Sequence, residues 1–552
     1  MVTHKIPKLI FFPICLLAIL MLTECKEHKS QKNGTLFGSS VYSSPNLVLN
    51  SAAITSHFKT DPVSDSIKNQ VTLFYTSRNY QYAWFNQKGI TDAASIFYNQ
   101  LQNYKNDFAN NDLNNAELDN LFIWAQTDEK EFYSQANCVE ELELLLTTTF
   151  FKYANKAYGG IAKTPLDLEW FIPRKKKNYQ ALLDSLLVST KGETIQEPLS
   201  KAYFQLKEKL RQYRDIQKKG GLPVIVPTKT LLITGDIDIC LFVAKQHLLL
   251  TGDLSFNDNN AVFTDALQKA VKHFQQRMGL VETGRIDTAT LNELNKSIDF
   301  RIQQIMVNME RLRWMPVKME KDYIIINIPE YQLHVYENDT SIWATNVVVG
   351  KNATKTSIFK SNLSEIVLNP YWGVPTSIVR SVILPQLKLD RSYLVKNNME
   401  LMGADNQVVN TASINWHKYK TNMPFTVRQK PGKDNALGKI KFLFPNQFSI
   451  YLHDTPAKDI FGETKRAFSH GCIRVNQPEK LAIYLLRKDS LWNAAKIDSI
   501  LATDNEMRIA VSHTIPVYIA YFTAWVGDDG QINFRNDVYN LDSKLLKDIL
   551  GE

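Results

Sequence analysis

The periodicity of apolar residues changes near residue 320, and this change constrains the fold more than any other feature of the sequence. Before it, apolar residues recur at the three- and four-residue spacing of amphipathic helices, with Asn, Asp, Gly and Pro between the runs. After it, short runs rich in branched and aromatic residues indicate β-strands. At 552 residues the chain is also too long for a single core. We therefore predict an α+β multidomain protein.

The change in pattern predicts a series of units along the chain. We expect a signal or anchor over residues 1–25, a polar tether over 26–60, a helical domain over 61–235, a small helical module over 236–300, a linker helix over 301–320 and a β-rich domain over 321–552. The clearest predicted helices are 94–101, 116–125, 139–153 and 199–218. Aromatic residues of the helical domain are expected in its core, namely Tyr75, Tyr80, Trp84, Trp124 and Trp170.

The N-terminus indicates export. Lys5 and Lys8 precede the apolar run 9–22, which is typical of a signal peptide or a short membrane anchor. Cys25 follows this run where a lipoprotein signal places its lipidated cysteine, but Glu24 stands where such signals carry a small residue. Lipidation of Cys25, a conventional signal peptide and an uncleaved anchor all stay open.

Charge and cysteine content narrow the function. The net charge of +8 is modest for this length, and no dense Lys/Arg block with interleaved aromatics is present, so we expect no nucleic-acid partner. If Cys15 and Cys25 belong to the signal, Cys138, Cys240 and Cys472 remain. Three widely spaced cysteines form neither a disulfide framework nor a metal-ligand pattern. A lone cysteine beside histidines is then either buried and inert or a nucleophile.

The module over 236–300 has clear helix boundaries. Thr264 is a predicted N-cap, Gly279 a predicted C-terminal stop, and Asp287 the N-cap of a second helix. The segment 270–291 resembles the peptidoglycan-binding-domain-1 module. An ordinary helical hairpin that links two domains is the alternative.

The β-rich region has several predicted strands and one insertion. The strands are 323–328, 332–336, 342–349, 365–368, 439–444, 449–453, 515–523 and 532–534. Pro329 lies between the first two strands, which we expect to form a hairpin, and residues 527–530 form a predicted turn before the last. Residues 376–430 are more helical and polar, as in an insertion or lid.

The chemically informative residues are His453 and the run Ser469-His470-Gly471-Cys472-Ile473-Arg474. A thiol attacks a carbonyl as the thiolate, so it needs an imidazole within reach and donors for the oxyanion. Asn476 is the predicted N-cap of a helix that follows this run, with Glu479 at the capping-box position.

Two alternatives to a nucleophilic cysteine stay open. The first is a zinc site formed by the cysteine, the two histidines and Asp454, although no metal-binding spacing supports it. The second is a buried structural cysteine, which the small polar neighbours disfavour.

These residues also carry a resemblance. His453 and the run 469–474 match the signature of the YkuD-type L,D-transpeptidase domain. The resemblance extends through 347–350, 369–375 and 435–442, and near the C-terminus through 521–525 and 537–539. These segments resemble the large, YcbB-like subgroup of Gram-negative bacteria, which has a helical scaffold domain, a peptidoglycan-binding module and a catalytic domain with a capping insertion. His470 departs from some large members, which carry a second serine there.

The resemblance assigns roles to single residues. It implies that Cys472 is the nucleophile and that His453 is the general base of a thiolate–imidazolium pair. Gly471 and Cys472 would contribute to the oxyanion environment, with Ser469 and His470 shaping the site. Arg474 would hold the motif or a substrate carboxylate, and a structural salt bridge is an equal alternative.

Substrate-binding residues are implied less directly. Asn369, Tyr371 and Trp372 would line the substrate groove, and a core role for the two aromatic residues is the alternative. Neither a metal nor another cofactor is implied.

The implied activity is that of a periplasmic L,D-transpeptidase in cell wall biogenesis. It would release D-Ala from a tetrapeptide stem and form a 3→3 cross-link, and carbapenems would acylate its cysteine. Its partners would be peptidoglycan stem peptides and glycan, and a membrane through the N-terminal anchor or lipid. A requirement for glycan-synthesis proteins stays open.

Other functions are not excluded by the sequence. Water or a protein amine could replace the second stem as acceptor, which would give an L,D-carboxypeptidase or an anchoring enzyme. A non-catalytic peptidoglycan-binding protein and a cysteine amidase or peptidase are the remaining alternatives.

Overall fold

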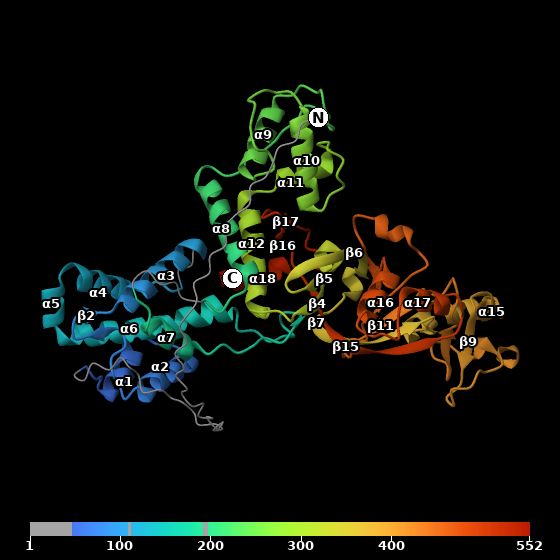
Figure 1. Cartoon of the computed structure of the whole chain (residues 1–552), viewed down its shortest axis with the longest axis horizontal. Helices are drawn as coiled ribbons and strands as arrows, with labels where there is room; N and C mark the ends of the chain where they lie inside the picture. The colour runs from blue at the N-terminus through green and yellow to red at the C-terminus, as the bar shows by residue number, and fades with distance from the viewer. Residues whose placement is uncertain (1–46, 109–111, 191–196, 552) are drawn as a thin grey trace, which may run out of the picture. The chain divides into compact units, whose positions relative to one another are not determined.

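The computed structural model describes residues 47–108, 112–190 and 197–551. The predicted signal with Cys15 and Cys25, and most of the predicted tether, lie outside these ranges. Helices prevail up to Trp314 and strands prevail after it, as the sequence predicts (Figure 1). Within the described ranges, every helix is too short or too polar to span a membrane.

The first region is a bundle of helices around an aromatic core. Its helices are α1 (Ser51–Thr60), α2 (Asp65–Ser77), α3 (Asp92–Phe108), α4 (Ala116–Thr127), α5 (Glu129–Ser134), α6 (Ala136–Ala154), α7 (Tyr179–Leu187) and α8 (Lys201–Lys218). A short hairpin joins β1 (Phe85–Asn86) to β2 (Gly89–Ile90). The four predicted helices are confirmed as α3, α4, α6 and α8. Tyr75 and Trp84 are buried in the core, as predicted, and Tyr80 and Trp124 pack against it.

The small module contains α9 (Cys240–Leu250), α10 (Asp265–Met278) and α11 (Thr288–Leu294). The predicted N-caps of α10 and α11 and the predicted end of α10 are confirmed. Thr264 and Asp287 accept hydrogen bonds as N-caps of α10 and α11, and Gly279 ends α10 in the left-handed conformation at φ 67°. The helix expected in the linker is α12 (Ile298–Trp314), which packs against α8.

The β-rich region is built on a sheet that closes on itself. Its strands are β4 (Asp322–Asn327), β5 (Gln332–Glu337), β6 (Thr340–Gly350), β7 (Ile358–Leu368), β11 (Ile440–Leu443), β12 (Leu452–His453), β13 (Ala467–Ser469), β14 (Ile473–Val475) and β15 (Met507–Ala520). Their order is β11-β12-β14-β6-β5-β4-β15-β7, and β7 pairs with β11 again. The pairing of β7 with β11 closes this path, which encloses an apolar core. The helices α16 (Pro478–Leu486), α17 (Ala494–Leu501) and α18 (Asp542–Leu550) pack on this core.

The two halves of the chain exchange short segments. Trp170 was expected in the helical core, but β3 (Trp170–Phe171) pairs with β7, so Trp170 lies in the core of the sheet. In the opposite direction, β16 (Ala524–Val526) and β17 (Ile532–Phe534) form a hairpin whose Ile532 and Phe534 pack in the helical core. The predicted turn of this hairpin is confirmed, but its first strand is separate from β15.

The insertion between β7 and β11 has its own small sheet and core. It contains β8 (Trp372–Gly373), α13 (Thr376–Ile378), α14 (Leu384–Leu389), α15 (Tyr393–Lys396), β9 (Met399–Met402) and β10 (Thr426–Gln429). Its strands follow the order β8-β10-β9. The helical prediction for this segment is therefore only half correct, because the insertion is a mixed structure around its own buried residues.

The predicted cap after the cysteine is wrong. The helix α16 begins at Pro478 with Gln477 at the N-cap position, and no side chain caps it. The strand β14 lies between Cys472 and this helix, and the Asn476 N–H continues its pairing by donating to the Asn346 carbonyl. Asn476 therefore still belongs to the sheet.

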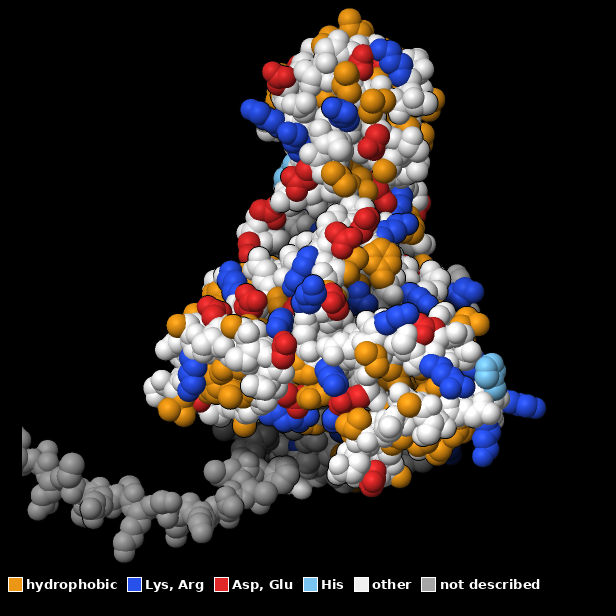
Figure 2. Space-filling view, turned by 90° about the vertical axis from the view of Figure 1, so that its right-hand side faces the viewer, with side chains coloured by type: hydrophobic (Ala, Val, Ile, Leu, Met, Phe, Trp, Pro, Cys, Tyr) orange, Lys and Arg blue, Asp and Glu red, His pale blue; other side chains and the backbone are white. Residues whose placement is uncertain are grey.

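One face of the molecule carries charges of both signs. On the face drawn in Figure 2, Lys and Arg side chains are interspersed with Asp and Glu side chains. Such a mixed surface gives no continuous basic footprint for a polyanion on this face.

Candidate active site

The run around Cys472 is a loop between two short strands of the sheet. Ser469 ends β13, which runs parallel to β6, and Ile473 begins β14, which runs antiparallel to β6. Gly471 has φ 119°, a left-handed backbone conformation that residues with a Cβ rarely adopt. The loop is thus fixed at both ends by one strand, β6.

His453 reaches this loop through the register of neighbouring strands. β12 and β14 are parallel, with His453 opposite Arg474, and the Ile473 N–H donates to the Tyr451 carbonyl at 3.1 Å. Because side chains alternate along strands, Tyr451 and His453 lie on the same face as Cys472 and Arg474. The rings of Tyr451 and His453 are 5.7 Å apart.

The hydrogen bonding of His453 defines its tautomer. Its Nδ1 lies 2.5 Å from the Asp454 carbonyl oxygen, which only accepts, so Nδ1 carries the proton and Nε2 keeps a lone pair. Burial lowers the pKa of His453 to about 3, and the charges of Arg474 and Lys441 act in the same direction. The ring is therefore a neutral base at physiological pH.

Cys472 is held as a thiol. Its Sγ lies 3.6 Å from the Ser449 carbonyl oxygen. Burial raises the pKa of the Cys472 thiol, while hydrogen bonds from Tyr451 and the charge of Lys441 oppose the rise. The thiolate–imidazolium pair expected from the resemblance is thus disfavoured from both sides, because burial favours the neutral form of each group.

Lys441 and Tyr451 were not singled out from the sequence. Lys441 lies opposite His453 in the β11–β12 pairing, and its Nζ is 4.1 Å from the centre of the Tyr451 ring. The alternation of Ile440, Lys441 and Phe442 places the lysine on the opposite face from two buried neighbours. That alternation was the available signal, but the strand pairing that brings Lys441 to the cysteine is not local.

Arg474 lies beside the cysteine with no negative partner. Its Nε is buried and has no hydrogen-bond partner among the described residues, and no ion pair is found for it there. Burial lowers the pKa of Arg474. The described residues therefore do not provide the structural salt bridge that was the alternative role for Arg474. Its guanidinium is available to an acceptor from outside the protein.

The loop backbone offers one free donor for an oxyanion. Ser469 is buried, its Oγ donates to the Cys472 carbonyl at 2.5 Å and it accepts the Gly471 N–H at 3.1 Å. The Gly471 N–H is thus occupied within the loop, whereas the Cys472 N–H has no acceptor among the described residues. The side chain of His470 is exposed to solvent.

The predicted groove residues have different surroundings. Asn369 is buried, and its Nδ2 donates to the Ile500 and Thr503 carbonyls at 2.8 and 2.7 Å, so its amide fixes a loop. The Tyr371 ring lies 4.4 Å from the Arg428 guanidinium, and Trp372 packs on the core of the insertion.

Asp454, the fourth ligand of the zinc alternative, has partners within the fold. Its Oδ2 accepts the Lys439 N–H at 2.9 Å, and its Oδ1 pairs with Lys458. Across the part of the chain that the structure describes, no three His, Cys, Asp or Glu side chains are grouped so as to hold a metal ion.

Comparison with known families identifies three regions. The family described as "L,D-transpeptidase catalytic domain", YkuD, matches residues 321–498. "Scaffold domain" matches residues 69–210, and "Putative peptidoglycan binding domain" matches residues 246–294. The resemblance and the fold class inferred from the sequence are thereby confirmed, and the YcbB-like subgroup stays a prediction.

One curated protein is similar to part of this chain. A Haemophilus influenzae protein named "Putative L,D-transpeptidase" is 35% identical over 246 residues, which are 44% of this chain and 49% of that protein. The chain thus spans about half the length of this curated relative.

Among solved structures, an L,D-transpeptidase from Stackebrandtia nassauensis is 13% identical with a TM-score of 0.21, covering 53% of this chain and 97% of that one. The avibactam carbamoyl enzyme of Ldtfm is 11% identical with a TM-score of 0.18, covering 57% and 98%.

Proposed function

We propose that this protein cross-links peptidoglycan stem peptides through a thioester on Cys472. The chain contains a YkuD-type L,D-transpeptidase catalytic domain and a peptidoglycan-binding domain. The observation that carries the proposal is the parallel register of β12 and β14, which places His453 and Cys472 on one face of the sheet. A thiol, a neutral imidazole with a free Nε2 and a free backbone N–H are the groups that acyl transfer needs.

In the first half-reaction, Cys472 takes the acyl group of a tetrapeptide donor. The thiol turns from the Ser449 carbonyl toward His453, which takes its proton while Sγ attacks the carbonyl between the third residue and D-Ala. The Cys472 N–H stabilises the oxyanion. The C–N bond then breaks, His453 returns the proton to the departing D-Ala amine, and a thioester remains.

In the second half-reaction, the side-chain amine of the third residue of another stem attacks the thioester. A C–N bond forms, the C–S bond breaks, and His453 carries the proton from the amine to sulfur. The product is a 3→3 cross-link, and the enzyme is regenerated. Lys441 lowers the energy of the transient thiolate in both halves, because its positive charge acts on Cys472.

Arg474 is the proposed site for a carboxylate of the stem. Its guanidinium lies on the face of the sheet that carries Cys472, and its buried Nε has no partner among the described residues. A stem carboxylate would satisfy this donor and place the adjacent carbonyl near the sulfur. Tyr371 and Trp372 are proposed to line the approach, whereas Asn369 supports the fold.

Product analysis tests the proposed function. Purified protein is incubated with a disaccharide tetrapeptide, and the products are separated and sequenced by mass spectrometry. We expect 3→3 dimers and one D-Ala per dimer from the wild type, and neither from Cys472→Ala. His453→Gln should lose about a thousandfold in rate. Cys138→Ala, which changes a cysteine of the helical region, is the matched control.

Other product patterns would change the assignment. D-Ala release without dimers would identify water as the acceptor, and therefore a carboxypeptidase. No release from a folded wild-type protein would favour a wall-binding protein without catalysis.

The cellular setting is proposed from the sequence alone. The apolar run 9–22 behind Lys5 and Lys8 supports export and retention at a membrane, in the periplasm of a Gram-negative bacterium. Labelling of Cys25 by a lipid precursor would distinguish a lipid anchor from an uncleaved anchor and from a conventional signal peptide.

A further inference from the structure

The carbonyl of Gly471, next to the proposed nucleophile, is held by Thr356, which lies in the connection between β6 and β7. The Thr356 Oγ1 donates to the Gly471 carbonyl at 2.8 Å and accepts the Gly350 N–H at 2.9 Å. Thr356 is 1% exposed. Because a hydroxyl has a single hydrogen to donate, this contact occupies the donor capacity of Thr356.

Tyr539, from the C-terminal part of the chain, holds Thr356 in turn. Its hydroxyl donates to the Gly350 carbonyl at 2.7 Å and accepts the Thr356 N–H at 3.1 Å. A Cβ at residue 350 would lie 2.1 Å from the Thr354 carbonyl oxygen, so the turn reaches the end of β6 only because residue 350 is Gly. One buried hydroxyl therefore joins both ends of this turn.

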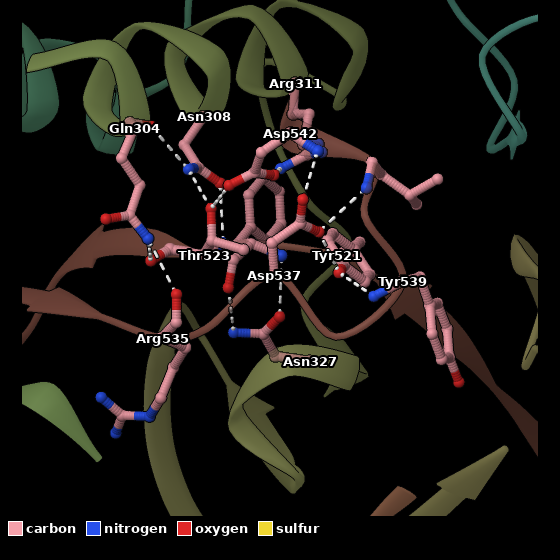
Figure 3. A network of polar contacts seen from close by, with 12 residues as sticks. Gln304, Asn308, Arg311, Asn327, Tyr521, Thr523, Arg535, Asp537, Tyr539 and Asp542 are labelled. Atoms are coloured by element: carbon pink, nitrogen blue, oxygen red, sulfur yellow. Dashed lines mark hydrogen bonds and ion pairs between the residues drawn. The ribbon is translucent and has the colours of Figure 1, made fainter. Parts of the chain in front are cut away.

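The position of Tyr539 depends on a larger polar network. The Tyr539 N–H donates to the Tyr521 hydroxyl at 2.8 Å, and that hydroxyl donates to Asp537 at 2.5 Å (Figure 3). Asp537 also accepts the Asp542 N–H at 2.8 Å, and Asp542 pairs with Arg311 of α12 at 2.6 Å. Hydrogen bonds thus run without interruption from α12 to the loop of Cys472.

This network determines the direction of the free backbone donor. The carbonyl of Gly471 and the N–H of Cys472 belong to one planar trans peptide group, so they point in opposite directions. A carbonyl fixed by Thr356 therefore fixes the direction of the Cys472 N–H. An oxyanion donor works only when it is oriented before the reaction.

We propose that Thr356 and Tyr539 are positioning residues, which orient the Cys472 N–H toward the oxyanion by holding the Gly471 carbonyl. The inference rests on the proposed function, because it assigns a role within the same acyl transfer. Neither residue touches the reacting atoms. In this view, the loop of Cys472 is held in place by Tyr539, which follows the cysteine by more than sixty residues in the chain.

Two reactions of the same sulfur separate this role from general support of the fold. Acylation by meropenem passes through an oxyanion and needs the N–H. Alkylation by iodoacetamide displaces iodide, forms a thioether and involves no oxyanion, so it depends only on the thiol. Both rates are measured on the full chain, by mass spectrometry, for the wild type and for Thr356→Val, Thr356→Ser and Tyr539→Phe.

We expect Thr356→Val to lower the acylation rate by about a hundredfold and Tyr539→Phe by about tenfold. Alkylation should stay within about twofold of the wild type, since the thiol is unchanged. Thr356→Ser keeps the hydroxyl and should restore acylation. Matched controls are Thr345→Val and Tyr518→Phe. The first removes a buried hydroxyl that has no partner among the described residues, and the second removes a hydroxyl that donates to Glu320 at 2.7 Å.

The outcomes separate the claims. The positioning role would be overturned if Thr356→Val and Tyr539→Phe lost acylation and alkylation equally. It would also be overturned if acylation were unchanged in these two variants. If Thr356→Val does not fold, Tyr539→Phe decides alone. A wild-type protein that is alkylated but never acylated would contradict the proposed function itself.

Discussion

The buried Glu143 carboxylate in the helical core and the polar groups on the sheet face around Cys472 differ in how completely they are hydrogen-bonded. In the helical core, the Glu143 carboxylate accepts the N–H groups of Ala83 and Trp84 at 2.6 and 2.9 Å and the Tyr75 hydroxyl at 2.8 Å. The Trp84 indole donates to Thr147 at 2.8 Å. Every oxygen of this carboxylate has a donor, as expected of groups that only stabilise the fold.

The sheet face leaves polar atoms available. Among the described residues, the Nε of Arg474 and the N–H of Cys472 have no acceptor, and His453 uses only Nδ1. Unsatisfied donors cost stability, so the two donors left without an acceptor beside the thiol are candidates for contact with a substrate. Buried polar atoms without a partner among the described residues also occur away from the site, as at Trp170, Thr345 and Asn369, so it is the position of the Arg474 and Cys472 donors beside the thiol that points to a substrate.

The largest expected effect concerns the buried neutral imidazole. The pKa of His453 is lowered from 6.5 to about 3, so the unfolded chain takes up a proton as the pH falls below 6.5 while the folded protein does not. Stability is then present above pH 6.5 and is lost toward pH 3, by about 5 kcal/mol. Urea denaturation from pH 7 to 4 should show about 3 kcal/mol of this loss in the wild type and less of it in His453→Gln. If the free energy of unfolding fell equally steeply with pH in both proteins, the buried neutral state of His453 would be contradicted.

The second effect tests the helical core, where the buried Glu143 carboxylate has a donor for each oxygen. Glu143→Gln places an amide N–H₂ against backbone donors, so it should lower the free energy of unfolding by about 2–3 kcal/mol. Acylation of the protein that remains folded should be unchanged. Glu117→Gln makes the same chemical change at an exposed position of α4 and should cost almost nothing. A loss of acylation at Glu143 in folded protein would break the distinction between scaffold and site.

Arg474 should show the opposite behaviour, with a gain in stability and a loss in binding. Arg474→Met removes a half-buried charge that has no negative partner among the described residues, so the melting temperature should rise. The KM for a tetrapeptide donor should increase about tenfold, the equivalent of one charged hydrogen bond. A donor whose third-residue carboxyl is amidated should bind both proteins equally. A lower melting temperature would mean that Arg474 supports the fold.

The smallest effect concerns the charge beside the thiol. Lys441→Met should move the pH dependence of iodoacetamide alkylation upward by about one unit, because a positive charge near Cys472 is lost. Lys441→Arg should keep the wild-type profile. A plateau below pH 6 in the wild type would instead establish a thiolate–imidazolium pair and contradict the neutral state described above.

Local features of the fold could be predicted from the sequence. The caps at Thr264 and Asp287 and the stop at Gly279 depend on neighbours four residues away or fewer, which the sequence displays directly. The exchange of Trp170 and Phe534 between the two cores could not be predicted. Nothing in the residues around Trp170 indicates that β3 pairs with β7, because that pairing joins residues far apart in the chain.

The site divides in the same way. Cys472 and His453 could be singled out from the sequence because their neighbours form a local signature. Lys441, Thr356 and Tyr539 were missed, since strand register and a C-terminal network bring them to the loop. Asn476 was assigned wrongly as a cap because the sequence does not show that the sheet continues past the cysteine.

The central claim is that Cys472 is an activated, acyl-accepting thiol, and intact-protein mass spectrometry with meropenem tests it most directly. We expect one adduct with the mass of meropenem on the wild type and on Cys138→Ala, and none on Cys472→Ala. An adduct that survives in Cys472→Ala, or a folded wild-type protein that forms none, would contradict the account.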